Sequence, residues 1–249
     1  MNYDGSKFYD DDAVFATYSG HRARAESPNN TLERPIIREL LGDVHGHDFL
    51  DLGCGDAAFG RELLAAGASS YMGVDGSENM VRQAREALQT TGGRVALAEL
   101  QDWVYPECNY SRVCARLVLH YLPELESLLH KVHQTLRPGG LFVFSVEHPV
   151  ITSCDIAWKD SGPRQDWVVD NYFNTGKRVT EWMGANVVKY HRTVEDHFLA
   201  LQRCGFGVES LRESKPVRSN FESEETFLRR ERIPLFLLIS ARRVSHAGT

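Results

Sequence analysis

The sequence has 249 residues, with 28 Lys and Arg against 34 Asp and Glu, and therefore a formal net charge of −6 at pH 7. This length suffices for one large α/β domain with a substantial core, and the composition, 42% hydrophobic and 25% charged, is ordinary for a soluble globular protein. The acidic balance argues against nucleic acid or an anionic membrane as a partner.

Signals for a membrane span, secretion or a metal site are missing from the sequence. We find no run of about 18 or more apolar residues, and the first four residues lack the basic start and apolar core of a secretory signal. Five cysteines without a C-x-x-C pair favour reduced thiols and a cytoplasmic location. The histidines are scattered and Glu147-His148 does not belong to H-E-x-x-H, so we expect no metal ion.

Two helices are expected in the polar N-terminal segment, residues 1–47. The acids at positions 10–12 can cap a helix that begins near Ala13. A second helix ends at Gly42, and its apolar residues recur at helical spacing: Leu32, Ile36, Ile37, Leu40 and Leu41.

Strand and helix patterns then alternate up to residue 148. The expected strands are Phe49–Leu52, Tyr71–Val74, Val95–Ala98, Arg112–Ala115 and Leu141–Val146. The expected helices are Phe59–Ala66, Ser77–Leu88 and a third from Pro123 to Leu136, stopped by Pro138-Gly139-Gly140. This alternation predicts a doubly wound, mostly parallel α/β sheet covered on both faces, with ligands bound at the carboxyl ends of its strands.

The alternation of strand and helix patterns stops at residues 149–190, which contain Trp158, Trp167 and Trp182. A loop-rich insertion of this length is usually functional or disordered, and its aromatic content argues against disorder. We expect it to wall the substrate cavity, although its aromatic side chains could instead form a small core of their own.

The remaining elements complete the sheet. A helix is expected over His191–Cys204, with Val194, Phe198 and Leu201 facing inward. Strands are expected near Val208–Leu211 and over Leu235–Ala241.

The most informative stretch is Phe49–Gly60, where an apolar run ends in an acid and two glycines follow one residue apart. Gly53 and Gly55 allow the backbone to approach a ligand. Asp75 ends the next strand, where an acid can accept hydrogen bonds from ribose hydroxyls. The pattern suits a nicotinamide dinucleotide or S-adenosylmethionine. Asp51, beside the glycine turn, would repel a pyrophosphate and attract a sulfonium with its ammonium group.

These segments resemble the class I S-adenosylmethionine-dependent methyltransferases, in the branch of small bacterial enzymes that act on small molecules. The matching pieces are Phe49–Gly60, Tyr71–Val81, Leu117–Tyr121, Leu136–Leu141, Ser145–Pro149, Tyr190–Thr193 and Pro234–Arg242. The resemblance implies a seven-stranded Rossmann-like fold and S-adenosyl-L-methionine as cofactor. It also implies one domain with four parts, which are lid helices (1–47), a cofactor-binding core (48–148), a substrate cap (149–190) and a completion of the sheet (191–249).

By this resemblance, Asp51 and the backbone of Gly53, Cys54 and Gly55 hold the methionine end of the cofactor. The backbone of Ala115 and Arg116 receives its ammonium group. One departure from the family pattern is Ala57, which stands where a third glycine is usual.

The resemblance also assigns the adenosine end. Asp75 takes the ribose hydroxyls, and the adenosine is lined by Gly76, Ser77 and Met80. Glu99 and Leu100 contact the adenine ring. Glu99 stands where Asp is commoner, and Asp102 is a rival for its role.

The N-terminal segment is expected to fold over the cofactor as a lid that includes Tyr18. Arg22 or Arg24 would pair with the cofactor carboxylate or with an acidic substrate, and the alternative is plain surface charge.

Methyl transfer from a sulfonium is a direct displacement, which requires mainly alignment and exclusion of water. A general base is needed only where the nucleophile keeps a proton. The candidates near the cleft are His120, Glu147, His148 and His191, and each has an alternative as a structural residue.

The sequence therefore predicts a cytoplasmic methyltransferase that acts on an oxygen or nitrogen atom of a small metabolite or natural-product intermediate. Neither nucleic acid nor a membrane is an expected partner, and the oligomeric state is left open. Two alternatives are a non-catalytic S-adenosylmethionine-binding partner subunit and a nucleotide-dependent oxidoreductase.

Overall fold

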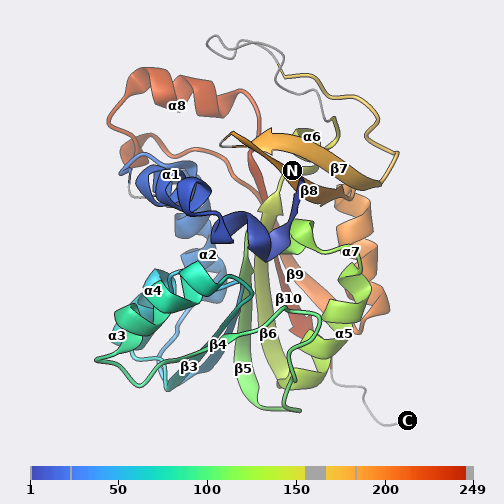
Figure 1. The fold of residues 1–249 in the computed structure, drawn as a ribbon. Coiled ribbons are helices and arrows are strands. Elements are labelled where there is room, and N and C mark those ends of the chain that lie inside the picture. The colour runs from blue at the N-terminus through green and yellow to red at the C-terminus, as the bar shows by residue number, and fades with distance from the viewer. Residues whose placement is uncertain (1, 23, 155–166, 183, 245–249) are drawn as a thin grey trace.

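A computed structural model describes residues 2–22, 24–154, 167–182 and 184–244 of the protein (Figure 1). Trp158 lies outside these residues. The helical elements are η1 (Gly5–Asp10), α1 (Asp12–Arg22), η2 (Asn29–Glu33), α2 (Arg34–Leu41), α3 (Ala58–Ala65), α4 (Glu78–Leu88), η3 (Leu119–Tyr121), α5 (Leu125–Thr135), α6 (Pro149–Thr152), α7 (Val194–Arg203), η4 (Arg218–Asn220) and α8 (Glu224–Glu231). The strands are β1 (Asn2–Asp4), β2 (Asp48–Leu52), β3 (Ser70–Asp75), β4 (Arg94–Leu97), β5 (Tyr110–Arg116), β6 (Leu136–Glu147), β7 (Gly176–Trp182), β8 (Ala185–His191), β9 (Phe206–Glu213) and β10 (Phe236–Arg243).

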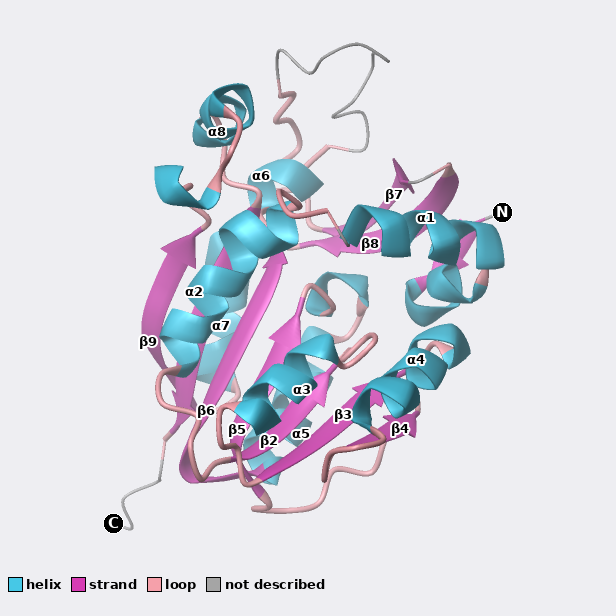
Figure 2. Cartoon of the chain, turned by 90° about the vertical axis from the view of Figure 1, so that its left-hand side faces the viewer, coloured by secondary structure: helices cyan, strands magenta, loops and turns pink. Residues whose placement is uncertain are grey.

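The main sheet has seven strands in the order β4-β3-β2-β5-β6-β10-β9. Strands β2 to β6 run parallel to one another, and β10 runs antiparallel to both β6 and β9. The doubly wound, mostly parallel sheet predicted from the alternation of elements is thereby confirmed. Helices α2, α3 and α4 cover one face, while α5 and α7 cover the other (Figure 2). None of the helices in the described part of the chain has the length and apolarity needed to cross a membrane.

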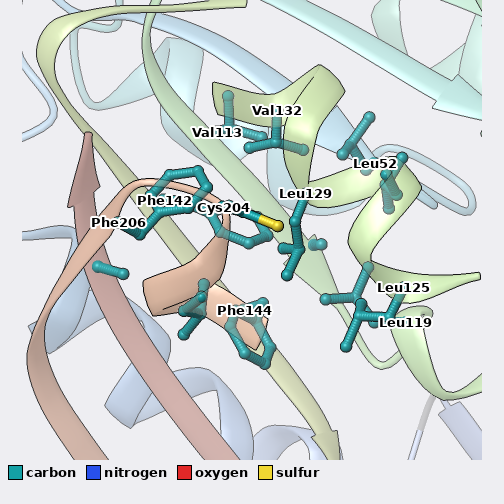
Figure 3. Packing of buried hydrophobic residues seen from close by; sticks show 14 of the residues in the cluster. Leu52, Val113, Leu119, Leu125, Leu129, Val132, Phe142, Phe144, Cys204 and Phe206 are labelled. Atoms are coloured by element: carbon teal, nitrogen blue, oxygen red, sulfur yellow. The ribbon is translucent and has the colours of Figure 1, made fainter. Parts of the chain in front are cut away.

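Side chains of β2 alternate between two buried layers, which explains why this strand is apolar on both faces. Leu50 and Leu52 pack in the layer of α5 and α7, while Phe49 packs in the layer of α2, α3 and α4. Figure 3 shows the first of these layers. Asp51 shares the face of Phe49, where a polar side chain requires a hydrogen-bond partner.

The segment that was expected to stop the third core helix belongs to a strand. Helix α5 ends at Thr135, and β6 begins at Leu136 and includes Pro138-Gly139-Gly140. Leu136 is extended and pairs with Tyr110, and the next paired residue is Leu141, so the intervening residues bulge out of the ladder. Proline and glycine are tolerated at such a bulge because the ladder hydrogen bonds are interrupted there.

The insertion is less loop-rich than predicted, because it contains a β-hairpin. Strands β7 and β8 pair antiparallel, and β8 also pairs in parallel with β1 at the N-terminus. The small sheet β1-β8-β7 lies above the carboxyl end of the main sheet in Figure 1. Strand β1 of the N-terminal segment and strand β8 of the insertion therefore meet above the carboxyl end of the main sheet, where a ligand is expected.

The helix expected over His191–Cys204 begins three residues later, at Val194, because His191 is the last residue of β8. Thr193 caps the helix in a capping box. Its side chain accepts from the backbone N–H of Asp196, and the side chain of Asp196 accepts from the backbone N–H of Thr193. The expected inward residue Phe198 is 36% exposed, and the neighbouring His197 is buried instead.

A close contact between α3 and β3 yields a stability test. A Cβ atom added at Gly60 would lie 2.1 Å from Cζ of Tyr71, whose ring fills the space beside the helix. We expect Gly60→Ala to lower the free energy of unfolding by about 1–3 kcal/mol through overpacking. The control is Gly20→Ala in α1, which meets no atom within 4 Å and gains helix propensity of about 1 kcal/mol at most. Denaturant unfolding of both variants checks this, and equal stabilities would contradict it.

Candidate cofactor and acceptor site

A cavity of about 840 Å³ lies at the carboxyl ends of β2, β3, β5 and β6. Its floor is formed by the strand ends and the loops that follow them. Its roof is formed by α1, the segment 24–29, the hairpin β7-β8 and α8. The volume lies near the upper end of the range for small-molecule sites, about 300–1,000 Å³.

The loop after β2 forms a glycine cradle on the cavity floor. Gly53 and Gly55 both have positive φ, at 68° and 57°, a conformation that glycine adopts without steric cost. A Cβ atom at Gly53 would lie 2.6 Å from Cγ2 of Val118. Ala57 also has a positive φ, 53°, at the N-cap of α3, at a cost of about 1–2 kcal/mol for a residue with a Cβ atom. The loop thus keeps its turn with alanine at the position of the usual third glycine.

Asp75 connects this cradle to the next loop. Its Oδ2 accepts a hydrogen bond from the backbone N–H of Gly55 at 2.8 Å, and its Oδ1 accepts one from Ser77 at 2.9 Å. Burial raises the pKa of Asp75 to about 6, although both backbone N–H groups act to lower it. Each carboxylate oxygen retains capacity for a further donor, and Asp75 lines the cavity.

Most of the residues that the resemblance assigns to the adenosine end lie along one wall of the cavity. Gly76, Met80, Glu99 and Leu100 all line it. Ser77 does not, because its hydroxyl caps α4 and donates to Asp10 at 2.7 Å. Glu99 accepts a hydrogen bond from Ser6, and the rival Asp102 is exposed and outside the cavity lining.

Asp51 is only 2% exposed and is anchored within the core. Tyr71 donates to its Oδ2 at 2.8 Å, and Cys114 donates to its Oδ1 at 3.3 Å. Burial raises the pKa of this carboxyl, which these hydrogen bonds partly offset. Asp51 and the neighbouring Cys54 reach the cavity surface together with Gly53 and Gly55.

Arg116 lies at the end of β5 and lines the cavity, but its charge is compensated by the carboxylate of Glu33. Its Nε donates to Oε1 of Glu33 at 3.0 Å, and its guanidinium lies 4.3 Å from the ring centroid of Phe59. Glu33 is fully buried and also accepts from Ser145 at 2.9 Å. The sequence reasoning missed Glu33; an acid on the apolar helical stretch 32–41 was the available signal. Ala115 is buried and does not line the cavity.

Glu147 and His120 line the far end of the cavity. Glu147 pairs with Lys189 of β8 at 2.6 Å; although burial would raise the pKa of Glu147, the ammonium of Lys189 lowers it overall. His120 accepts at Nδ1 from the backbone N–H of Glu147 at 3.4 Å, which leaves its proton on Nε2. Burial lowers the pKa of His120 to about 4, so the ring is neutral at pH 7.

His148 and His191 are not among the residues that line the cavity. His148 accepts at Nδ1 from Val150 and donates from Nε2 to Glu213. His191 accepts at Nδ1 from Thr152 and donates from Nε2 to the carbonyl of Tyr172. Both rings use both nitrogens inside the fold, and this arrangement favours their structural interpretation.

The N-terminal segment and the insertion meet in an aromatic cluster formed by Phe8, Tyr9, Tyr18 and Trp182. Phe8 stacks on Trp182 with ring centroids 5.2 Å apart, and Tyr18 meets Tyr9 edge-on at 4.9 Å. Tyr9, Tyr18 and Trp182 line the cavity, as does Arg22. Trp182 of the insertion thus packs against N-terminal aromatic side chains and also lines the cavity, whereas Tyr172 and Phe173 pack on each other outside the cavity lining.

Comparison with known proteins identifies the family. Residues 49–140 match the family model described as a methyltransferase domain. The crystal structure of an S-adenosylmethionine-dependent methyltransferase from Mesorhizobium loti is 37% identical, with 90% of this chain and 100% of that chain covered and a TM-score of 0.79. The chain belongs to the S-adenosylmethionine-dependent methyltransferases.

Two further relatives agree with this assignment. A putative S-adenosylmethionine-dependent methyltransferase from Listeria monocytogenes is 31% identical, with 86% of this methyltransferase and 97% of that chain covered and a TM-score of 0.79. A fatty-acid O-methyltransferase of Mycolicibacterium smegmatis is 27% identical over 59% of this chain and 57% of its own. The alternatives of an oxidoreductase and a non-catalytic subunit are set aside, because the protein is an enzyme with S-adenosylmethionine as cofactor.

The cavity floor of this methyltransferase fits that cofactor. Gly53 and Gly55 line the cavity without a side chain, so a ligand can approach the backbone of the cradle. Asp51, Asp56, Asp75 and Glu99 give the floor a negative charge, which complements a sulfonium and an ammonium group.

The raised pKa of Asp75 predicts a pH dependence of cofactor binding. If the ribose hydroxyls donate to the ionised carboxylate, as the resemblance implies, protonation of Asp75 in the free enzyme competes with binding. We expect the Kd for S-adenosylhomocysteine to rise by about tenfold from pH 8 to pH 5, since the carboxyl titrates at about 6. Calorimetry across this range measures the change. Asp75→Asn serves as the control and should bind weakly at every pH; a wild-type Kd that stays constant would contradict the prediction.

Proposed function

We propose that this methyltransferase transfers a methyl group to an oxygen or nitrogen atom of a small metabolite or natural-product intermediate. The observation that carries this proposal is the roof of the cavity, in which the N-terminal segment and the cap hairpin are joined by aromatic packing. Such a roof leaves room for a small acceptor beside the cofactor. Aromatic walls also favour an acceptor with a flat or apolar part.

We assign the cofactor as follows. Asp75 receives the ribose hydroxyls, and the adenine ring lies against Met80, Glu99 and Leu100. The methionine end lies on the cradle of Gly53–Gly55 above Asp51. These assignments rest on the positions of the side chains along one cavity wall. When bound, S-adenosylmethionine supplies an electrophilic methyl group on a sulfonium.

His120 and Glu147 are the candidates for contact with the acceptor. His120 holds its proton on Nε2, so it serves as a hydrogen-bond donor that orients the nucleophile rather than as a base. Glu147 is kept ionised by Lys189 and lines the same end of the cavity. This pair suits a nucleophile that reaches the site without a proton, such as a carboxylate oxygen or a neutral nitrogen. One relative is a fatty-acid O-methyltransferase, and its acceptor atom is an oxygen, which supports an oxygen acceptor here.

The proposal predicts where the methyl group goes. The enzyme is incubated with S-adenosylmethionine that carries a radiolabelled methyl group, together with separate fractions of small metabolites, RNA and protein. We expect label in material that passes an ultrafilter, and none in RNA or protein. Glu147→Gln should reduce this label, and Glu78→Gln, a change to an exposed acid on α4, should not. Label confined to RNA or to protein would overturn the proposal.

We further propose that residues 1–47 act as a lid over the cofactor. Asp10 holds this segment on α4 by accepting from the hydroxyl of Ser77 at 2.7 Å and from the backbone of Asn79 at 3.3 Å. A second link joins Ser6 to Glu99 at the adenine end. The lid is thus attached to three residues near the assigned cofactor position, Ser77, Asn79 and Glu99.

Removal of this attachment tests the lid. Asp10→Ala loses two hydrogen bonds, each worth about 1 kcal/mol, and we expect the Kd for S-adenosylhomocysteine to rise by about threefold to tenfold. Glu78→Ala removes an exposed acid from the first turn of the same helix and is the matched control. Calorimetry on both variants gives the comparison. An unchanged Kd in Asp10→Ala would show that the segment is not a lid.

A further inference from the structure

The charges around the cavity are distributed unevenly between floor and roof. The acids of the floor are Asp51, Asp56, Asp75 and Glu99, while its base Arg116 is paired with Glu33. The bases of the roof are Arg22, Arg24, Arg178, Lys189, Arg229 and Arg230. The roof has two acids, Glu26 and Glu181, and Glu26 accepts from the backbone at the start of α8. A further floor acid, Glu147 at the end of β6, pairs with Lys189 of the roof. The roof therefore keeps a positive charge.

Arg178 of β7 is the most constrained of these bases. Arg178 is 8% exposed, and among the described residues its guanidinium donates to three backbone carbonyls, those of Ser153, Asn174 and Lys177. Within the described residues no carboxylate pairs with it. A buried cation without an anionic partner is costly, and three of its five N–H donors are used. Arg178 also lines the cavity, so its remaining donors have an anion-binding position available.

Arg230 of α8 supplies a second cation from another element of the roof. Its Nε is buried and has no hydrogen-bond partner among the described residues. Burial and the neighbouring Arg229 lower the pKa of Arg230 to about 10, so it is charged at pH 7. Helix α8 is attached to the lid side of the cavity, because Glu26 accepts from the backbone N–H of Ser223 at 2.8 Å.

We propose that the roof is an anion-binding subsite and that the methyl acceptor carries an oxyanion group, a carboxylate or a phosphate, held by Arg178 and Arg230. This inference rests on the proposed small-molecule function and narrows its substrate class. Lys189 is not part of the subsite, because Glu147 already compensates its charge. Arginine suits this role because its planar fork binds carboxylate and phosphate through two parallel hydrogen bonds.

Calorimetry on the enzyme saturated with S-adenosylhomocysteine tests the subsite with three probes that share a phenyl ring and differ in the polar group attached to it. Phenylacetate and phenyl phosphate carry the oxyanion, and phenylacetamide is the neutral counterpart. We expect at least one anion to bind about tenfold or more tighter than the amide, with the preferred anion identifying carboxylate or phosphate. Arg178→Gln and Arg230→Gln should each remove most of this preference. Arg85→Gln, at an exposed position on α4, should preserve it.

Several results would overturn this proposal. One is equal binding of anion and amide, and another is no binding of either anion at a probe concentration of about 10 mM. A third is a preference that survives both arginine substitutions. Loss of S-adenosylhomocysteine affinity in Arg178→Gln would assign the arginine to the cofactor carboxylate instead. If wild type fails to bind S-adenosylhomocysteine, the assigned cofactor site fails; if it binds and the anion preference is absent, only this subsite fails.

Discussion

The carboxylate of Asp75 is the constraint on which the floor of the cavity depends. It accepts from Gly55 in the loop after β2 and from Ser77 at the start of α4, so one side chain connects the two loops at the proposed cofactor position. Ser77 in turn donates to Asp10 of the N-terminal segment. A change in the protonation of Asp75 therefore acts on the cradle, on the cap of α4 and, through it, on the attachment of the proposed lid. Its burial makes this coupling stronger, because electrostatic interactions grow as water is excluded.

The core of the fold is predictable from the sequence because its strands are covered on both faces. Leu50 and Leu52 alternate with Phe49 between two apolar layers, and Met80, Val81, Ala84 and Leu88 recur at helical spacing on α4 and are buried. The floor residues follow from the same logic, since parallel strands bring Asp51, Asp75 and Arg116 to one edge. The start of α7 is a different case, because His191 pairs with the distant Gly176 in the hairpin, and the capping box of Thr193 and Asp196 begins the helix only at Val194.

The roof could not be predicted in the same way, because its strands depend on partners far away in the chain. Strand β8 carries Lys189 and Tyr190 and gains its neighbour β1 from the other end of the sequence. Local alternation is weak in such a hairpin, and pairing rather than propensity decides its structure. Separation along the chain also explains why two ion pairs could not be predicted. Glu33 pairs with Arg116, and His148 pairs with Glu213, in each case from another element of the fold. Side chains that are satisfied by remote partners look like free catalytic candidates in a sequence.

The two ends of the roof are joined, and this has a consequence for how the cavity is entered. The N-terminal segment contacts the floor through Ser6 and Asp10, and it contacts the hairpin through β1 and through Phe8 on Trp182. If this segment is the proposed lid, a movement that admits the cofactor also disturbs β8, which carries Lys189, the partner of Glu147. The cofactor side and the acceptor side thus share one structural unit. Closure over the cofactor would then set the position of Lys189 and Glu147 at the acceptor end, and this order suits an enzyme that must align a nucleophile with a methyl group and exclude water.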